Sequence, residues 1–279
     1  MNLIISFGYH DVVCDNNFES GFQNIGAIQY KLRSNVFEHQ IGIISDYLES
    51  KQLDKNLVAL TFDDGGESFY SVIAPVLEKY GFKGYFFITT SLIGTKGFVS
   101  REQVKELHTR GHVIGTHSHT HPKNISNLSY GKIEEEWSNS VEILSNIISE
   151  KVRVASIPGG FYSEKSRKAL LKCGIEIIFT SYPSRKVRHN ADNQYIIGRF
   201  SIKKDTSSKS LIRLISNNGF FVICEFIKWK VLALARLTLG NKYYLIREAL
   251  LKSVCVGYLI LTRCVLINWD EIYLLTNEI

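Results

Sequence analysis

Seven short apolar runs, most of them separated by segments of helical periodicity, constrain the fold of this 279-residue chain more than any other feature. Runs of this length that are mostly apolar are typical of buried strands. Because strands that alternate with helices form parallel sheets or barrels covered by those helices, we expect an α/β fold of this kind. The runs are Leu3–Phe7, Leu57–Phe62, Tyr85–Thr89, Val113–Gly115, Val154–Ile157, Ile175–Thr180 and Tyr195–Phe200.

Three of the intervening segments carry helix signals. Ser34 is expected to cap a helix whose apolar stripe is Phe37, Ile41, Ile44 and Leu48. Ser100 and Gln103 have the spacing of a capping box, and Gly111 is placed to end that helix. A third helix is predicted from the stripe Tyr130, Ile133, Trp137, Val141 and Leu144.

Two aspartates, Asp63 and Asp64, stand at the end of the second apolar run and are followed by Gly65 and Gly66. Charged groups at the carboxyl end of a buried strand point into the crevice where α/β proteins bind ligands. Adjacent side chains on a strand point in opposite directions, so both carboxylates reach one site only if the chain turns there. The two glycines permit such a turn. Two like charges held together require a cation or a shared proton.

Three histidines lie within five residues, in the segment Gly115-Thr-His-Ser-His-Thr-His-Pro122. Neutral imidazole is the commonest protein ligand for transition metals, and a carboxylate completes a mixed nitrogen and oxygen site. A His-rich tract by itself is also compatible with a solvated polar loop whose histidines are incidental. The aspartate pair about fifty residues earlier favours the metal site.

These segments resemble the polysaccharide deacetylase family, which has a NodB-homology domain and is related to carbohydrate esterase type 4. Thr61-Phe62-Asp63-Asp64-Gly65 and His117-Ser118-His119-Thr120-His121-Pro122 are similar to its first two motifs, and Ser156-Ile157-Pro158-Gly159-Gly160 stands where its third is expected. The resemblance covers residues 1–205. It implies a distorted (β/α) barrel with seven strands and a metal-dependent hydrolase that removes acetyl groups from N-acetylated sugars.

The resemblance also implies roles for individual residues. Asp64, His117 and His121 correspond to the ligands of one divalent metal ion, with zinc favoured and cobalt, nickel or manganese as alternatives. Asp63 corresponds to the general base, and the segment Pro158, Gly159 and Gly160 is expected to contact substrate and the oxyanion. Ser118 is interpreted as a local hydrogen-bonding residue and His119 as pointing away from the metal.

Amide hydrolysis needs an acid to protonate the departing amine. Most family members supply a histidine from a late Leu-x-His motif, but the last histidine here, His189, lies in a basic stretch interpreted as a solvated loop. His10, at the end of the first run, is the candidate acid, since first and last strands are neighbours in a closed barrel. The alternative for His10 is a structural role in closing the barrel. Ser156 replaces the arginine that often orients the catalytic aspartate, which puts the positioning of Asp63 in question.

Residues 206–279 differ from the 1–205 barrel domain. From residue 201 onward there are eleven Lys or Arg against six Asp or Glu, in a chain of net charge +6. We expect a basic amphipathic helical extension made of Leu211–Asn218, Phe220–Leu239 and Tyr243–Leu266. It would contact an anionic membrane surface or pack on the barrel or a partner. Val254–Trp269 is too short and too interrupted for a membrane span. No nucleic-acid-recognition motif accompanies the charge.

The five cysteines include no CxxC pair, and the first residues lack a signal-peptide pattern. We therefore expect a cytoplasmic location that includes the inner membrane face. Three functions are compatible with these features. The leading one is N-deacetylation of a cell-surface or exopolysaccharide, or of its lipid-linked precursor. The second is hydrolysis of non-sugar linear or cyclic amides. The third, from the altered third motif and the absent late histidine, is a catalytically weakened scaffold of glycan assembly.

Overall fold

The strands form one nine-stranded sheet in the order β11-β1-β4-β5-β6-β7-β8-β10-β9, seen in a computed structural model that describes residues 4–14 and 19–239. Every pairing in this sheet is parallel except that between β10 and β9. The strands are β1 Ile5–Tyr9, β4 Val58–Phe62, β5 Gly84–Ile88, β6 Val113–Thr116, β7 Val154–Ser156, β8 Ile177–Phe179, β9 Val187–His189, β10 Tyr195–Ile197 and β11 Phe200–Ser201. A separate parallel pair joins β2 Val12–Val13 to β3 Leu32–Arg33.

One interrupted strand, formed by β10 and β11, closes the sheet into a ring. Its first half pairs with β8, and after Gly198 and Arg199 its second half pairs with β1. Together with β1, β4, β5, β6, β7 and β8 it makes seven parallel strands. This arrangement confirms the distorted α/β barrel predicted from the sequence. The hairpin partner β9 was not predicted, because its residues were interpreted as a loop.

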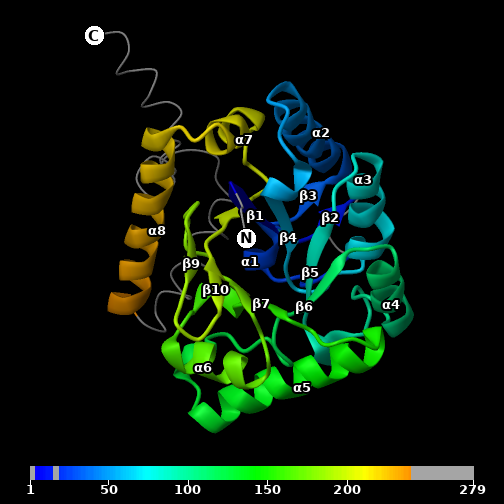
Figure 1. Ribbon diagram of the computed structural model, residues 1–279, viewed down its shortest axis with the longest axis vertical. Helices are drawn as coiled ribbons and strands as arrows, with labels where there is room; N and C mark the ends of the chain where they lie inside the picture. The colour runs from blue at the N-terminus through cyan, green and yellow to red at the C-terminus, as the bar shows by residue number, and fades with distance from the viewer. Residues whose placement is uncertain (1–3, 15–18, 240–279) are drawn as a thin grey trace. The chain divides into compact units, whose positions relative to one another are not determined.

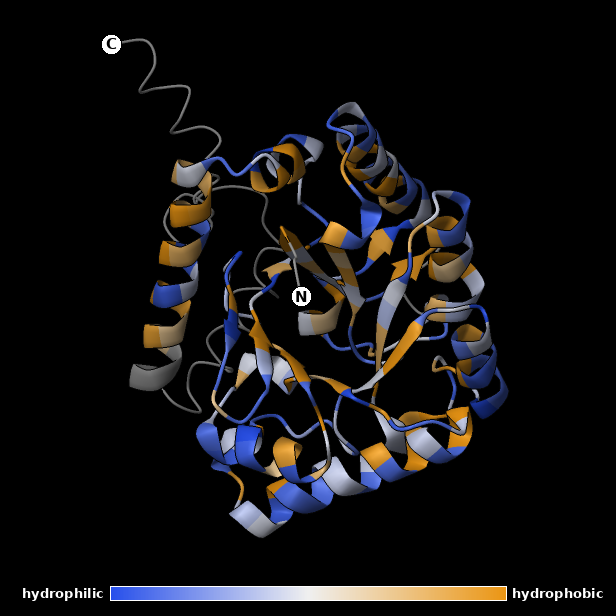
Figure 2. Cartoon of the chain, viewed as in Figure 1, coloured by the Kyte–Doolittle hydropathy of each residue, from blue (hydrophilic) through white to orange (hydrophobic). Residues whose placement is uncertain are grey.

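The helices surround the ring of strands (Figure 1). Their bounds in the barrel are α1 Ile25–Ile28, α2 Ser34–Ser50, α3 Ala74–Lys79, α4 Arg101–Thr109, α5 Tyr130–Ile148 and α6 Glu164–Lys172. The capping box of Ser100 and Gln103 is formed at the start of α4. Ser34 is not the cap of α2; Arg33 holds that position without a side-chain hydrogen bond. Hydrophobic residues line the strands and alternate with hydrophilic ones along α2 and α5 (Figure 2).

Two separate cores follow from the alternation of side chains along the strands. The larger core lies between strands and helices and takes the outward row of each strand, such as Leu60 and Phe62 of β4. The smaller core fills the barrel and consists of Ala59, Phe87, Val154, Phe179 and Ile197. Gly115 of β6 provides space in it, because an added Cβ would lie 2.6 Å from the Phe87 ring. The inward rows end at the carboxyl edge of the barrel.

The barrel unit extends past the boundary that we predicted at residue 205. Helix α7, Ser208–Ile215, buries Leu211, Leu214 and Ile215 in the larger core, and the compact unit runs to Val231. It thus includes the first part of α8, Gly219–Leu239. The physical reason is that α7 packs against α2, which makes it part of the barrel rather than of an extension. The predicted segment Tyr243–Leu266 and the span considered at Val254–Trp269 lie outside the described residues.

Helix α8 is less amphipathic than predicted. Phe226 packs edge-on against the Tyr182 ring at 5.6 Å between centroids, whereas Ile223 and Ile227 on the same helix are exposed. Within the described residues, no single helix is both long and apolar enough to cross a membrane. By length and composition alone, Ser208–Ile215 and Gly219–Ala235 meet that criterion together, as a pair bent by 108°.

Candidate active site

The aspartate pair ends strand β4, and a turn in the backbone brings both carboxylates to the mouth of the barrel. Asp63 continues the inward row of Ala59 and Thr61, while strand alternation alone would turn Asp64 outward. Instead Asp64 has φ 86° and Gly65 has φ 91°. A positive φ is uncommon for a residue other than glycine, and such strain is often found at functional sites. The turn therefore begins one residue earlier than the glycines that predicted it.

A buried network behind this turn explains the second glycine. A Cβ on Gly66 would lie 1.8 Å from Oδ1 of Asp11, so only glycine fits. That carboxylate accepts hydrogen bonds from Ser20 at 2.6 Å and from Ser68 at 3.1 Å. Lys31, which is also buried, has its Nζ 3.8 Å from Asp11. The network ties the segment after the aspartate pair to the loop that follows β1.

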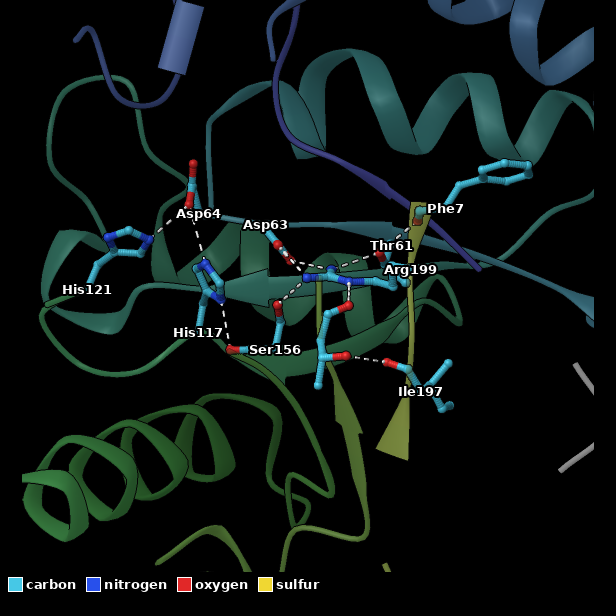
Figure 3. A network of polar contacts seen from close by, with 10 residues as sticks. Phe7, Thr61, Asp63, Asp64, His117, His121, Ser156, Ile197 and Arg199 are labelled. Atoms are coloured by element: carbon cyan, nitrogen blue, oxygen red, sulfur yellow. Dashed lines mark hydrogen bonds and ion pairs between the residues drawn. The ribbon is translucent and has the colours of Figure 1, made fainter. Parts of the chain in front are cut away.

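Asp64, His117 and His121 come together as a cluster of possible metal ligands, and their ligand atoms all lie within 4.8 Å of one another. Oδ1 of Asp64 is 3.5 Å from Nε2 of His117 and 3.5 Å from Nε2 of His121 (Figure 3). His117 continues the inward row of β6 beyond Gly115, and His121 reaches back from the following loop with φ 55°. Two imidazole nitrogens and one carboxylate oxygen suit zinc and its neighbours.

Hydrogen bonds set the orientation of these two histidines. Nδ1 of His117 lies 2.9 Å from the carbonyl oxygen of Ser156, so it carries the proton and leaves the Nε2 lone pair free to bind a metal ion. The Ser118 hydroxyl accepts a hydrogen bond from the backbone N–H of His121 at 3.1 Å. This local contact is consistent with the structural role predicted for Ser118. His119 is directed elsewhere, with Nδ1 2.9 Å from the Thr90 hydroxyl.

Glu136 of α5 holds the loop between His117 and His121, the histidine loop, from outside the barrel. Its Oε2 accepts hydrogen bonds from the backbone N–H groups of His119 at 3.0 Å and Thr120 at 2.8 Å. Its Oε1 accepts a third from the Thr120 hydroxyl at 2.5 Å. Because the loop connects His117 to His121, this clamp fixes the separation of the two histidines.

Asp63 has a partner that sequence reasoning missed. Both of its oxygens accept hydrogen bonds from Arg199, each at 2.8 Å. The same guanidinium donates to the Ser156 hydroxyl at 2.8 Å and to Thr61 Oγ1 at 3.0 Å (Figure 3). A signal was present in the sequence, since Arg199 is the one charged residue within the apolar run Tyr195–Phe200. A charge buried in such a run requires a partner.

The charges around the two aspartates favour their ionised forms. Burial alone would raise the pKa of Asp63, but Arg199, His117 and His10 together outweigh it and hold that pKa well below its ordinary value. Burial is likewise outweighed at Asp64, whose pKa is lowered by the nearby His117, His10 and His121. Two ionised carboxylates therefore share one buried place, an arrangement that a bound cation would stabilise.

His10 lies at the mouth of the barrel, directly after β1. It continues the inward row of Ser6 and Gly8, and its charge acts on both Asp63 and Asp64. The His10 ring packs on Tyr30, with the centroids 4.5 Å apart, and its Nδ1 is buried without a hydrogen-bond partner among the described residues. His189, by contrast, is on β9, where it contacts Asn193 and Tyr195. The stretch around His189 is thus partly a strand, not the loop that we predicted.

Pro158, Gly159 and Gly160 form the 3-10 turn η5, directly after β7. Both glycines have positive φ, 60° and 74°. The N–H of Gly160 is used within the turn, where it donates to the Ile157 carbonyl at 3.2 Å. The aromatic residue Phe22 lies beside a candidate ligand, with its ring centroid 5.1 Å from that of His121.

Comparisons with known proteins agree with this geometry. The sequence profile of the family described as polysaccharide deacetylase matches residues 50–178. The Bacillus subtilis (strain 168) protein named "Putative polysaccharide deacetylase YxkH" is 31% identical over 140 residues, which are 50% of this chain and 50% of that protein. The poly-beta-1,6-N-acetyl-D-glucosamine N-deacetylase of Staphylococcus aureus (strain MSSA476) is 24% identical over 234 residues, 73% of this chain and 80% of that protein.

Solved structures share the fold. The deacetylase PplD of Streptococcus pyogenes, in complex with acetate, superposes with a TM-score of 0.60 at 21% identity, over 76% of this chain and 97% of that one. IcaB from Ammonifex degensii gives a TM-score of 0.57 at 20% identity, over 77% and 97%. In the sequence comparison, the matched part of the chain spans half the length of the B. subtilis relative. With the two aspartates and two histidines of its motifs gathered at the mouth of such a barrel, the chain matches the polysaccharide deacetylase family over residues 50–178.

Proposed function

We propose that this protein is a metal-dependent deacetylase that removes acetyl groups from the N-acetylated sugars of an exopolysaccharide or of its lipid-linked precursor. The observation that carries the proposal is the convergence of Asp64, His117 and His121 next to Asp63 at the carboxyl edge of the barrel. This is the edge where barrel enzymes place their reactive groups.

The three ligand atoms fit one divalent transition metal, with zinc favoured and cobalt, nickel or manganese as alternatives. The bound metal would supply Lewis acidity for the acetamide carbonyl and activation of the attacking water. Asp64 would hold it with a carboxylate oxygen, and the Nε2 atoms of His117 and His121 would complete the protein's share. The hydrogen bond from His117 to Ser156 keeps that imidazole in the required tautomer.

Two groups that follow the neighbouring strands β1 and β4 would transfer the protons. Asp63 is ionised, so it can accept the proton of the attacking water. His10, whose Nδ1 has no partner among the described residues, can donate a proton to the departing amine nitrogen. The amine leaves as the C–N bond of the acetamide breaks, and the acetyl group leaves as acetate.

The substrate class is proposed from a relative. The S. aureus protein of 24% identity is named for poly-beta-1,6-N-acetyl-D-glucosamine, which makes a β-1,6-linked N-acetylglucosamine polymer the first substrate to test. A half-buried phenylalanine, Phe22, packs beside His121 and could contact the face of a sugar ring.

The test is acetate release by the zinc-loaded full chain from β-1,6- and β-1,4-linked N-acetylglucosamine oligomers. We expect release by the wild type and its loss in Asp64→Ala. The matched control is Asp46→Ala, which removes an exposed aspartate from α2 and should leave the rate unchanged. The proposal is contradicted if the wild type releases no acetate from either oligomer, or if it hydrolyses a non-sugar acetamide more efficiently than both.

A further inference from the structure

Arg199 occupies an unusual place in the barrel, inside the gap between β10 and β11. Gly198 makes this possible, because a Cβ there would lie 2.3 Å from the carbonyl oxygen of Tyr182. The N–H of Arg199 then donates to that same carbonyl at 2.9 Å. The backbone is thus pressed against the loop after β8, and the Arg199 side chain follows the inward row of Tyr195 and Ile197 into the barrel.

The guanidinium rests on the apolar core that fills the barrel. Its Cζ is 5.8 Å from the ring centroid of Phe87 and 6.0 Å from that of Phe179. Arg199 is 2% exposed. A buried arginine is stabilised in this position only if its donors are satisfied, and they are: Nη1 and Nη2 bind Asp63 on both oxygens, and Nε donates to the Thr180 carbonyl at 3.3 Å.

We propose that Arg199 is the positioning residue of Asp63, supplied by the strand that closes the barrel, with Ser156 as its second anchor. The planar fork of a guanidinium fixes the plane of a carboxylate that it binds through two parallel hydrogen bonds. Asp63 can therefore present its remaining lone pairs in one direction only. Ser156 joins the two halves of the site, because its hydroxyl accepts from Arg199 and its carbonyl accepts from His117.

The inference rests on the proposed deacetylase function, and the variants separate the two. Arg199→Met keeps the length of the side chain but removes the fork. In the zinc-loaded protein we expect kcat to fall about 10- to 100-fold, as for other residues that orient catalytic groups, with KM unchanged. Arg199→Lys should also lose most of kcat, because an ammonium cannot bind both oxygens in one plane.

A second buried arginine provides the matched control. Arg167 is 8% exposed and binds Glu164, Asp192 and Gln194, away from the aspartate pair. Arg167→Met should lower the melting temperature as Arg199→Met does but leave kcat of the folded protein unchanged. Adding Ser156→Arg to Arg199→Met should restore part of kcat, because the Ser156 side chain contacts the Arg199 guanidinium in the wild type.

The outcomes are distinct. A wild type without activity contradicts the proposed function, and the crystal structure of Arg199→Met then tests the inference by itself: a rotated Asp63 carboxylate supports it, and an unmoved one overturns it. With an active wild type, wild-type kcat in Arg199→Met overturns the inference. If Arg199→Met does not fold, wild-type kcat in Arg199→Lys does the same.

Discussion

At the scale of single residues, the site depends on residues that each form polar contacts with two other residues. His117 uses one ring nitrogen to donate to the Ser156 carbonyl and presents the other to Asp64. The Ser156 hydroxyl in turn accepts from the arginine that binds Asp63. The metal ligand and the candidate base are therefore held by one residue of β7, a position that in sequence looked like the loss of a functional arginine.

His10 is the candidate general acid of the proposed deacetylation. Replacing it with glutamine keeps a polar side chain but removes the transferable proton. We expect His10→Gln to lower kcat about 100-fold or more, the usual contribution of a general acid. The measurement is acetate release by the folded, zinc-loaded variant, with His189→Gln, on strand β9, as the control that should keep its rate. A His10→Gln rate within twofold of the wild type would remove His10 as the acid.

Another histidine, His112, makes the stability of the fold depend on pH. Its Nδ1 accepts from the Gly84 N–H at 3.1 Å and its Nε2 contacts Glu78 at 3.0 Å, so the neutral ring is the one that fits. Burial lowers the pKa of His112 below its ordinary value of 6.5. The unfolded chain therefore takes up a proton first as the pH falls below 6.5, which weakens the folded state.

We expect this residue to contribute a loss of unfolding free energy of at most about 1.4 kcal/mol per pH unit below pH 6.5, and none above it. The check is denaturant unfolding from pH 5 to pH 8, compared between the wild type and His112→Gln. The wild type should lose more stability than the variant on acidification. Parallel curves for the two proteins would show that His112 is not linked to folding.

At the scale of elements, helix α5 positions the histidine loop through a single side chain. Glu136 accepts three hydrogen bonds from residues 119 and 120, and these bonds hold the chain between His117 and His121. Its neighbour Glu135 faces solvent and pairs with Lys132 on the same helix. The two adjacent glutamates therefore offer a matched pair of variants.

Glu136→Ala should weaken zinc binding about 10- to 100-fold, the usual effect of removing a residue that orients metal ligands. Glu135→Ala should change the affinity by less than twofold, because an exposed ion pair contributes little. Both affinities can be measured by competition with a zinc chelator. Equal affinities in the two variants would show that the loop keeps its geometry without the clamp.

At the scale of the whole molecule, periodicity predicted a parallel sheet or barrel covered by helices, because the strands are buried on both faces and the helices carry apolar stripes. The choice of a seven-stranded barrel came from the resemblance to the family. The closure of the ring could not be predicted, since it depends on Gly198 and Arg199 splitting one apolar run between two partners. The compact unit runs past the boundary predicted at residue 205, because α7 is buried by its contact with α2, and this contact could not be read from the sequence of α7 alone.

The site residues that lie in short local motifs could be predicted. The contacts between residues far apart in the sequence could not. Asp63, Asp64, His117 and His121 stand in two short segments, and the structure brings all four to one edge of the barrel. The pairing of Asp63 with Arg199 spans 136 positions of the chain. The turn was predicted at Gly65 and Gly66, but its start at Asp64 was not, because glycine is the residue that normally marks a positive φ.

The proposed deacetylase chemistry depends most on the binding of one divalent metal ion by Asp64, His117 and His121 together. Calorimetric titration of zinc into the metal-stripped full chain tests it directly. We predict one tight equivalent for the wild type and the loss of that binding in His117→Ala and in Asp64→Ala. A wild type that binds no zinc, or variants that bind it as tightly as the wild type does, would contradict a metal site formed by these three residues.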